Sequence, residues 1–134
     1  MTTPIVDSMP FASLLGVELV SAGTDEVRGT LAWAPERCTS AGAMHGGALM
    51  ALADTVAAVC AVLNLRPGEG TTTIESKTNF FRAVREGTVE AVSRPLHVGR
   101  TTIVVQTDLR DQRGRHVAQV TQTQAVLAAR PPDR

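Results

Sequence analysis

The hydrophobic residues follow two different patterns along this chain, and the change between them marks out its elements. From residue 43 to residue 63 nearly every position is apolar, which is the pattern of a helix buried on all sides. Further along, residues 101–109 and 116–127 alternate between apolar and polar, which is the two-residue period of a strand with one buried face. With the Thr-rich segment 71–81 and the segment 88–98, these predict four strands after the helix.

Shorter elements are predicted before the long helix. Met9 to Leu15 has the spacing of a short amphipathic helix, and Gly16 is expected to end it. Residues 17–20 and 27–33 flank a segment rich in turn-forming residues, so we expect them to pair as a β-hairpin. Residues 35–42 are predicted to form a polar loop.

This order of elements restricts the architecture. A sheet with one apolar face needs a second layer to cover that face, and only the long helix is large enough to do so. The sequence therefore predicts an α+β fold in which a curved antiparallel sheet wraps around one central helix. We expect a single domain over residues 1–134, with a frayed tail at 128–134.

The length of the apolar segment approaches that of a membrane span. However, the segment is rich in Ala and Gly, and Asp54 lies in its middle. A charged side chain at the centre of a bilayer costs about 2.5–3.5 kcal/mol. A core helix is therefore favoured, and no membrane partner is expected. The N-terminal residues also lack the basic and apolar regions of a secretory signal.

Composition and charge narrow the function further. The chain is 43% hydrophobic and 19% charged, with a formal net charge of 0, and it has no basic motif for nucleic acid. Positive charge is concentrated in residues 71–134, where it could meet a phosphorylated ligand or simply be solvated. Three scattered His and the two cysteines Cys38 and Cys60 lack metal-ligand spacing, so no metal is expected. Free thiols indicate a cytoplasmic location.

The sequence His45-Gly46-Gly47 stands at the start of the predicted long helix. The first turn of a helix has unpaired N–H groups and a partial positive charge. Glycines allow a ligand to approach that backbone closely, as a carbonyl oxygen gaining negative charge requires. The alternative is that both glycines only let the helix pack against the sheet.

Asp54 is the only acidic residue of the apolar segment. A buried carboxylate needs a partner, a raised pKa or a cleft. In a cleft it could act as a general base or as a nucleophile. The alternative is a structural role in a contact between helices.

The spacing of His45 and Asp54 bears on the oligomeric state. Nine helical residues would place them on opposite sides of the helix and about 13 Å apart along it. They cannot then form a catalytic pair within one chain. If both serve one site, two helices must run antiparallel about a two-fold axis, so that each Asp54 lies near His45 and Gly46 of another copy.

A helix opened by His-Gly-Gly, with an acidic residue nine positions after the His, resembles the hot-dog-fold thioesterases of the phenylacetate-pathway (PaaI-like) group. The segment TIESKTNFFR at residues 73–82 resembles the strand that follows the helix in that group. The run His97-Val98-Gly99-Arg100 resembles the next turn. The likeness covers residues 10–128.

This resemblance implies a hot-dog fold and an enzyme that hydrolyses an aryl- or medium-chain acyl-CoA. Gly46 N–H would polarise the thioester carbonyl, and Asp54 of a facing subunit would activate water or attack directly. Thr73 would orient the water or the carboxylate, and His45 would hold the loop. Coenzyme A would enter only as part of the substrate, with no further cofactor.

The remaining substrate contacts are implied in the same way. Gly47 would lie beside the bound thioester, and Gly99, Arg100 and Arg82 would contact the phosphates of coenzyme A, unless the two arginines only pair with surface charges. The group suggests a homotetramer built as a dimer of dimers. Two alternative functions stay open: a hot-dog dehydratase or hydratase, and a non-catalytic acyl-CoA-binding protein.

Overall fold

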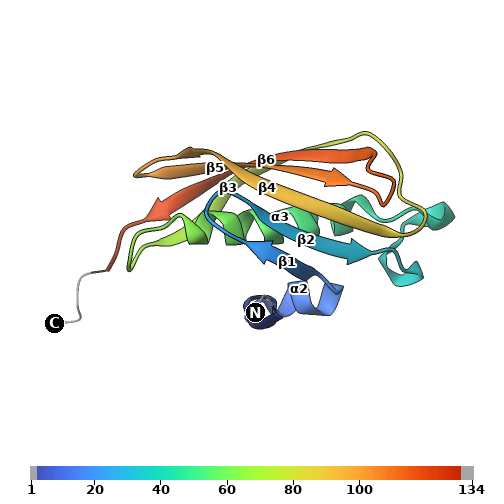
Figure 1. Ribbon diagram of the computed structural model, residues 1–134, viewed down its shortest axis with the longest axis horizontal. Coiled ribbons are helices and arrows are strands. Elements are labelled where there is room, and N and C mark those ends of the chain that lie inside the picture. Colours follow the sequence, from blue (N-terminus) through green and yellow to red (C-terminus); the bar gives the residue numbers. More distant parts are fainter. Residues whose placement is uncertain (1–2, 131–134) are drawn as a thin grey trace.

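Helix α3 (Gly46–Leu63) lies along the concave side of a six-stranded sheet, and the two together form the body of the fold (Figure 1). The computed structural model describes residues 3–130. The other helices and strands are α1 (Thr3–Asp7), α2 (Pro10–Leu15), β1 (Glu18–Ala22), β2 (Val27–Ala32), β3 (Gly70–Phe80), β4 (Thr88–Val98), β5 (Thr102–Arg110) and β6 (His116–Leu127).

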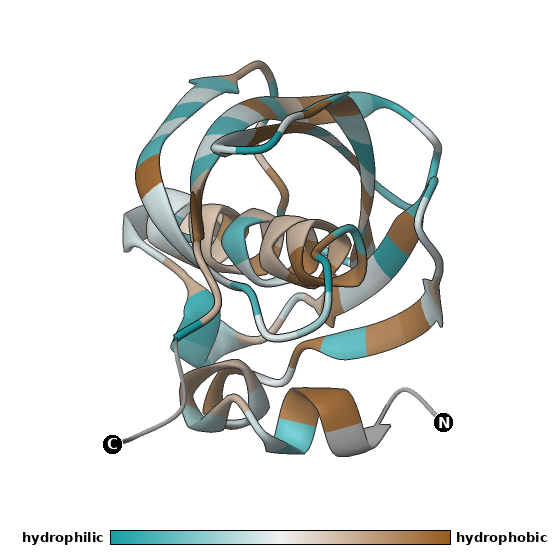
Figure 2. Ribbon diagram, turned by 90° about the vertical axis from the view of Figure 1, so that its left-hand side faces the viewer, coloured by the Kyte–Doolittle hydropathy of each residue, from teal (hydrophilic) through white to brown (hydrophobic). Residues whose placement is uncertain are grey.

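The strands are arranged in the order β1-β2-β4-β5-β6-β3, and every neighbouring pair is antiparallel. Seen along α3, the sheet curls around the helix (Figure 2). The predicted curved antiparallel sheet around a central helix is therefore confirmed. Strands β1 and β3 are the two edges, and the 11-residue β3 is exposed along most of its length.

The core forms where the apolar face of the sheet meets the helix. On α3 the residues Leu52, Ala53 and Val56 are each 0% exposed. The predicted alternation in β5 is confirmed, because Ile103, Val105 and Leu109 all face this core; the other fully buried aliphatic residues of the sheet are Val27, Leu31, Val89, Val117 and Val120. By length and composition α3 could cross a membrane, but 56% of its residues are buried inside this fold.

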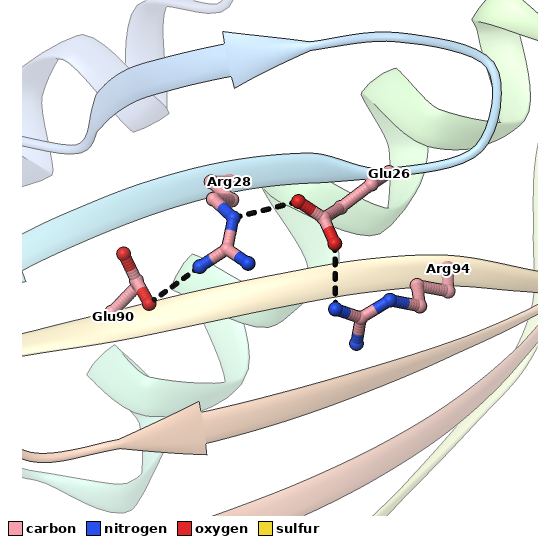
Figure 3. A network of polar contacts seen from close by, with 4 residues as sticks. All are labelled: Glu26, Arg28, Glu90 and Arg94. Carbon is pink, nitrogen blue, oxygen red and sulfur yellow. Dashed lines mark hydrogen bonds and ion pairs between the residues drawn. The ribbon is translucent and has the colours of Figure 1, made fainter. Parts of the chain in front are cut away.

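A chain of ion pairs ties the β1–β2 hairpin to β4 on the outer side of the sheet (Figure 3). Arg28 contacts Glu26 at 2.7 Å and Glu90 at 3.0 Å, while Arg94 contacts Glu26 at 2.6 Å. The hydrogen bond from Arg28 lowers the pKa of Glu26. These pairs are solvent-exposed, so they contribute to register more than to stability.

Several local predictions need correction. Helix α1 was not predicted, because five residues with three apolar side chains give too short a pattern. Residues 35–42 contain two short 3₁₀ helices in place of a plain loop, Pro35–Arg37 and Ser40–Gly42. At the other end, residues 128–130 follow β6 without regular structure, and the rest of the predicted tail lies outside the described residues.

Strand β2 approaches α3 closely at Gly29. A Cβ atom built there would lie 2.7 Å from Val56 Cγ2 and 3.2 Å from the Glu18 carbonyl oxygen. A side chain would push the strand away from the helix.

We predict that Gly29→Ala lowers the free energy of unfolding by about 1–3 kcal/mol through overpacking. The matched control is Gly23→Ala, because a Cβ at Gly23 meets nothing closer than 3.7 Å. Denaturant unfolding of both variants measures the difference. Equal stability of the two would contradict the packing described.

Candidate active site

The start of α3 is organised by His45, which caps the helix from outside it. The His45 backbone is extended, with φ −60° and ψ 133°, and its Nδ1 accepts a hydrogen bond from Gly47 N–H at 2.7 Å. Gly46 N–H has no acceptor within residues 3–130. The helix N-terminus therefore offers one free backbone donor, at Gly46, whereas the Gly47 donor is already used.

A hollow of about 330 Å³ adjoins this donor and is lined by Ala43, Met44, Gly46, Leu49, Phe80, Phe81, Arg82 and Ala83. We call it the Gly46 half-site. The ring of Phe80 lies so close to Gly46 that a Cβ there would be 3.1 Å from Phe80 Cζ. The absence of a side chain at Gly46 therefore lets the Phe80 ring pack against the start of the helix.

Asp54 belongs to a different hollow of about 240 Å³, lined by Met50, Ala51, Asp54, Thr73 and Ser76. We call it the Asp54 half-site. The Asp54 side chain is exposed in the single chain, so the prediction of a buried carboxylate is wrong. Its Oδ1 accepts a hydrogen bond from Gln122 Nε2 at 2.8 Å. The structure thus brings Asp54 and Thr73 together, as the resemblance implied.

The predicted relation between His45 and Asp54 also changes. His45 precedes the helix, so the 100° step per residue does not apply to it. The open side of α3 instead carries Gly47, Met50 and Asp54, which are spaced by three and four residues. Gly46 and Asp54 line separate hollows about 12 Å apart along the helix axis. Within one chain, the Gly46 N–H donor and the Asp54 carboxylate therefore do not share a hollow.

The inward face of β6 supplies polar residues that the sequence analysis missed. Gln122 and Gln124 are 0% and 1% exposed, and Gln124 Nε2 donates to Thr73 Oγ1 at 3.0 Å. Ser76, opposite Gln122 in the β3–β6 ladder, was missed as well. The signal was present: the inward positions of β6 change from Ala118 and Val120 to two glutamines.

The expected phosphate-binding residues are far apart within one chain. Arg82 N–H bonds Val117 O at 3.2 Å, whereas Val126 N–H bonds Thr101 O at 2.9 Å, next to Gly99 and Arg100. Nine residues of β6 separate these points, or about 30 Å. Arg82 instead lines a hollow of about 520 Å³ whose other charged residues are Arg85, Glu86, Asp111, Arg113 and Arg115.

No cluster of three or more His, Cys, Asp or Glu within the described part of the chain could hold a metal ion. The positive side chains of the Arg82 hollow outnumber the negative ones, and Asp111 is already paired with Arg115 at 2.8 Å. The Arg82 hollow, which shares Arg82 with the Gly46 half-site, therefore has an excess of positive charge that favours an anionic ligand.

Comparison with known proteins defines the class. Residues 41–118 match the model of the thioesterase superfamily. The proofreading thioesterase EntH of Cronobacter turicensis is 33% identical over 101 residues, which are 75% of this chain and 74% of that protein. The chain therefore belongs to the thioesterase superfamily and is a thioester hydrolase, as the resemblance implied.

Solved structures agree with this assignment. Thioesterase HI1161 from Haemophilus influenzae superposes with a TM-score of 0.92 at 25% identity, covering 100% of this chain and 95% of that one. A thioesterase from Streptococcus pneumoniae, solved with coenzyme A, has a TM-score of 0.78 at 26% identity, with 87% and 89% coverage. The predicted hot-dog fold is confirmed.

We predict that His45→Ala lowers the free energy of unfolding by about 1 kcal/mol, because the Gly47 N–H loses its acceptor. His45→Asn should retain most of that stability, since Asn is a good helix cap. Thermal unfolding compares the two variants. If Ala and Asn were equally destabilising, the capping role of His45 would be wrong.

Proposed function

We propose that this protein is an acyl-CoA thioesterase that converts an aryl- or medium-chain acyl-CoA to the free acid and coenzyme A. The observation that carries the proposal is the pairing of two unfinished half-sites. One offers the free N–H of Gly46 at a helix N-terminus, and the other offers the Asp54 carboxylate held by a hydrogen bond. Together they hold the electrophilic and basic groups that thioester hydrolysis needs.

In the proposed reaction, Gly46 N–H hydrogen-bonds the thioester carbonyl oxygen and stabilises its negative charge. Asp54 takes a proton from a water molecule whose oxygen attacks the carbonyl carbon. The C–S bond then breaks, and the thiolate of coenzyme A takes up the proton. In the alternative route, Asp54 attacks the carbonyl carbon itself, the C–S bond breaks and the thiolate of coenzyme A leaves. Water then cleaves the resulting anhydride, which releases the acid, restores the Asp54 carboxylate and supplies the proton that the thiolate takes up. Neither route requires a metal or a further cofactor.

The site requires a second copy of the chain, and the edge of the sheet supports this proposal. Strand β3 pairs only with β6, and its free edge leaves a long row of backbone groups available for another strand. Apolar side chains beside that edge are also exposed, with Met50 41%, Ile74 60% and Phe80 50% accessible. A second β3 pairing antiparallel would cover all of these groups.

A single two-fold axis can pair both α3 and β3 with the same elements of a second copy. On α3, the midpoint between Gly46 and Asp54 is Met50. On β3, the midpoint between the Asp54 hollow and Phe80 falls near Lys77. An axis through these two midpoints places each Asp54 beside Gly46 of the other copy. The proposed unit is therefore a dimer, and two such dimers would make the tetramer that the group suggests.

The same axis explains the positions of the arginines. Antiparallel pairing brings the β4–β5 turn of one copy, with Gly99 and Arg100, to the end of the molecule where Arg82 of the other copy lies. We propose that these groups hold the phosphates of coenzyme A. The coenzyme A bound by the Streptococcus pneumoniae relative supports this type of ligand.

A cytoplasmic location is part of the proposal, because acyl-CoA is an intracellular substrate. The two cysteines are free, and burial raises the pKa of the Cys60 thiol to about 11. That thiol stays protonated and unreactive in a reducing compartment.

We predict that Asp54→Asn reduces kcat for acyl-CoA hydrolysis by at least about a hundredfold, since the amide can neither accept the proton nor attack. Thiol release over a panel of aryl- and medium-chain acyl-CoAs measures this. Asp7→Asn is the matched control, because Asp7 lies in α1, away from both half-sites. Activity that survives in Asp54→Asn would refute the proposed chemistry.

We predict that Arg82→Gln raises KM for an acyl-CoA about tenfold, but leaves KM unchanged for the same acyl group on pantetheine, which lacks the nucleotide phosphates. Arg94→Gln serves as the control, because Arg94 is bonded to Glu26 on the outer side of the sheet. A KM that rises equally for both thioesters would argue against phosphate binding by Arg82.

A further inference from the structure

Two buried glutamines occupy core positions at which hydrophobic side chains are expected. The inward positions of β6 that face α3 are Ala118, Val120, Gln122 and Gln124, all at most 1% exposed. An amide in such a position has a free-energy cost unless it is hydrogen-bonded. The only other fully buried polar side chains within residues 3–130 are Ser93 and Thr107, which bond each other at 2.6 Å.

The two glutamines do not bond each other but form hydrogen bonds with two residues of the Asp54 half-site. Gln122 Nε2 donates to Asp54 Oδ1 at 2.8 Å, and Gln124 Nε2 donates to Thr73 Oγ1 at 3.0 Å. Both contacts cross from the interior of the sheet to residues that are exposed in the single chain. Two buried side chains of β6 thus form hydrogen bonds with residues of the proposed active site.

The orientation of the Gln122 amide is set by its hydrogen bond to Asp54. A carboxylate only accepts hydrogen bonds, so the nitrogen of Gln122 must face Asp54. Its Oε1 is then left buried without a donor, which is unfavourable for stability. A hydrophobic residue would avoid this unpaired acceptor but would give Asp54 no hydrogen bond.

Gln124 has a different effect on Thr73. Thr71 Oγ1 lies 3.1 Å from Gln124 Oε1 and 2.9 Å from the Ala125 carbonyl oxygen, so its single hydrogen is shared between these two acceptors. The contact with Oε1 is made with the Gln124 nitrogen facing Thr73. Because Thr73 Oγ1 accepts from that nitrogen, its own hydroxyl hydrogen is free to be donated into the hollow. Thr73 is therefore prepared as a donor to the water or to the carboxylate.

We propose that Gln122 and Gln124 are positioning residues for hydrolysis. Gln122 holds one oxygen of Asp54, so that the other oxygen faces the hollow, and Gln124 makes Thr73 a hydrogen-bond donor. This inference rests on the proposed function. It extends that function by adding two residues of β6 that act on the reaction only through Asp54 and Thr73.

The test compares Gln122→Leu and the isosteric Gln122→Glu with Gln119→Leu. Gln119 is the matched control because it lies on the outer side of the same strand and its Nε2 donates to Asp108 Oδ1 at 3.1 Å. Each variant is assayed for kcat and KM with an acyl-CoA that the wild type hydrolyses. Thermal unfolding is measured beside the kinetics.

For Gln122→Leu we expect kcat to fall about tenfold with KM unchanged, since the lost bond acts on the reacting carboxylate and not on substrate binding. Gln122→Glu should lower kcat at least as far, because a carboxylate accepts hydrogen bonds and cannot donate one to Asp54.

Gln122→Leu should also be at least as stable as the wild type, because the unpaired Oε1 disappears. The inference is overturned if Gln122→Leu keeps the wild-type kcat, or if Gln119→Leu shows the same loss. It is also overturned if kcat falls only in proportion to unfolded protein. A wild type that hydrolyses no acyl-CoA would overturn the proposed function, whereas active wild type with fully active Gln122→Leu overturns only this inference.

Discussion

The packing of α3 into the concave face of the sheet is the constraint on which the rest of the structure depends. The buried side of the helix holds Leu52, Ala53 and Val56 against the strands, and Gly29 lets β2 approach it closely. The sheet covers only part of the helix circumference, so the side next to β3 stays open. The contact that forms the core therefore also decides which helical residues can meet a substrate, with Asp54 among them.

Because of this packing, the Gly46 N–H donor and the Asp54 carboxylate lie at two separate places on the chain. The donor at Gly46 is fixed by the helix start, and the carboxylate of Asp54 lies two turns further along the same helix. Because the helix is rigid, no movement of side chains within one copy can join them. The open edge of β3 and the exposed side of α3 lie next to each other, and in the proposed dimer a second copy would cover both and complete the two sites.

The central helix could be predicted from its continuous apolar run, once its Ala and Gly content and Asp54 had argued against a membrane span, and strand 116–127 could be predicted from its two-residue alternation. The way in which α3 begins could not be predicted from the sequence. His45 caps the helix from outside, and that role depends on backbone angles that composition does not reveal. Gln122 was missed because its importance depends on the register that sets β6 against Asp54, which is a tertiary contact.

The most direct test of the shared site is activity from a mixture of two inactive variants. Gly46→Pro removes the N–H donor at the first helical position, where the backbone suits proline and the preceding His45 already has extended angles. The Phe80 ring must shift slightly to make room for the new Cβ. Asp54→Asn removes the base. Co-expressed in equal amounts, the two chains should form mixed dimers with one intact site, giving about a quarter of the wild-type activity. Activity no higher than that of either variant alone, with mixed dimers shown to form, would contradict a site built from two copies.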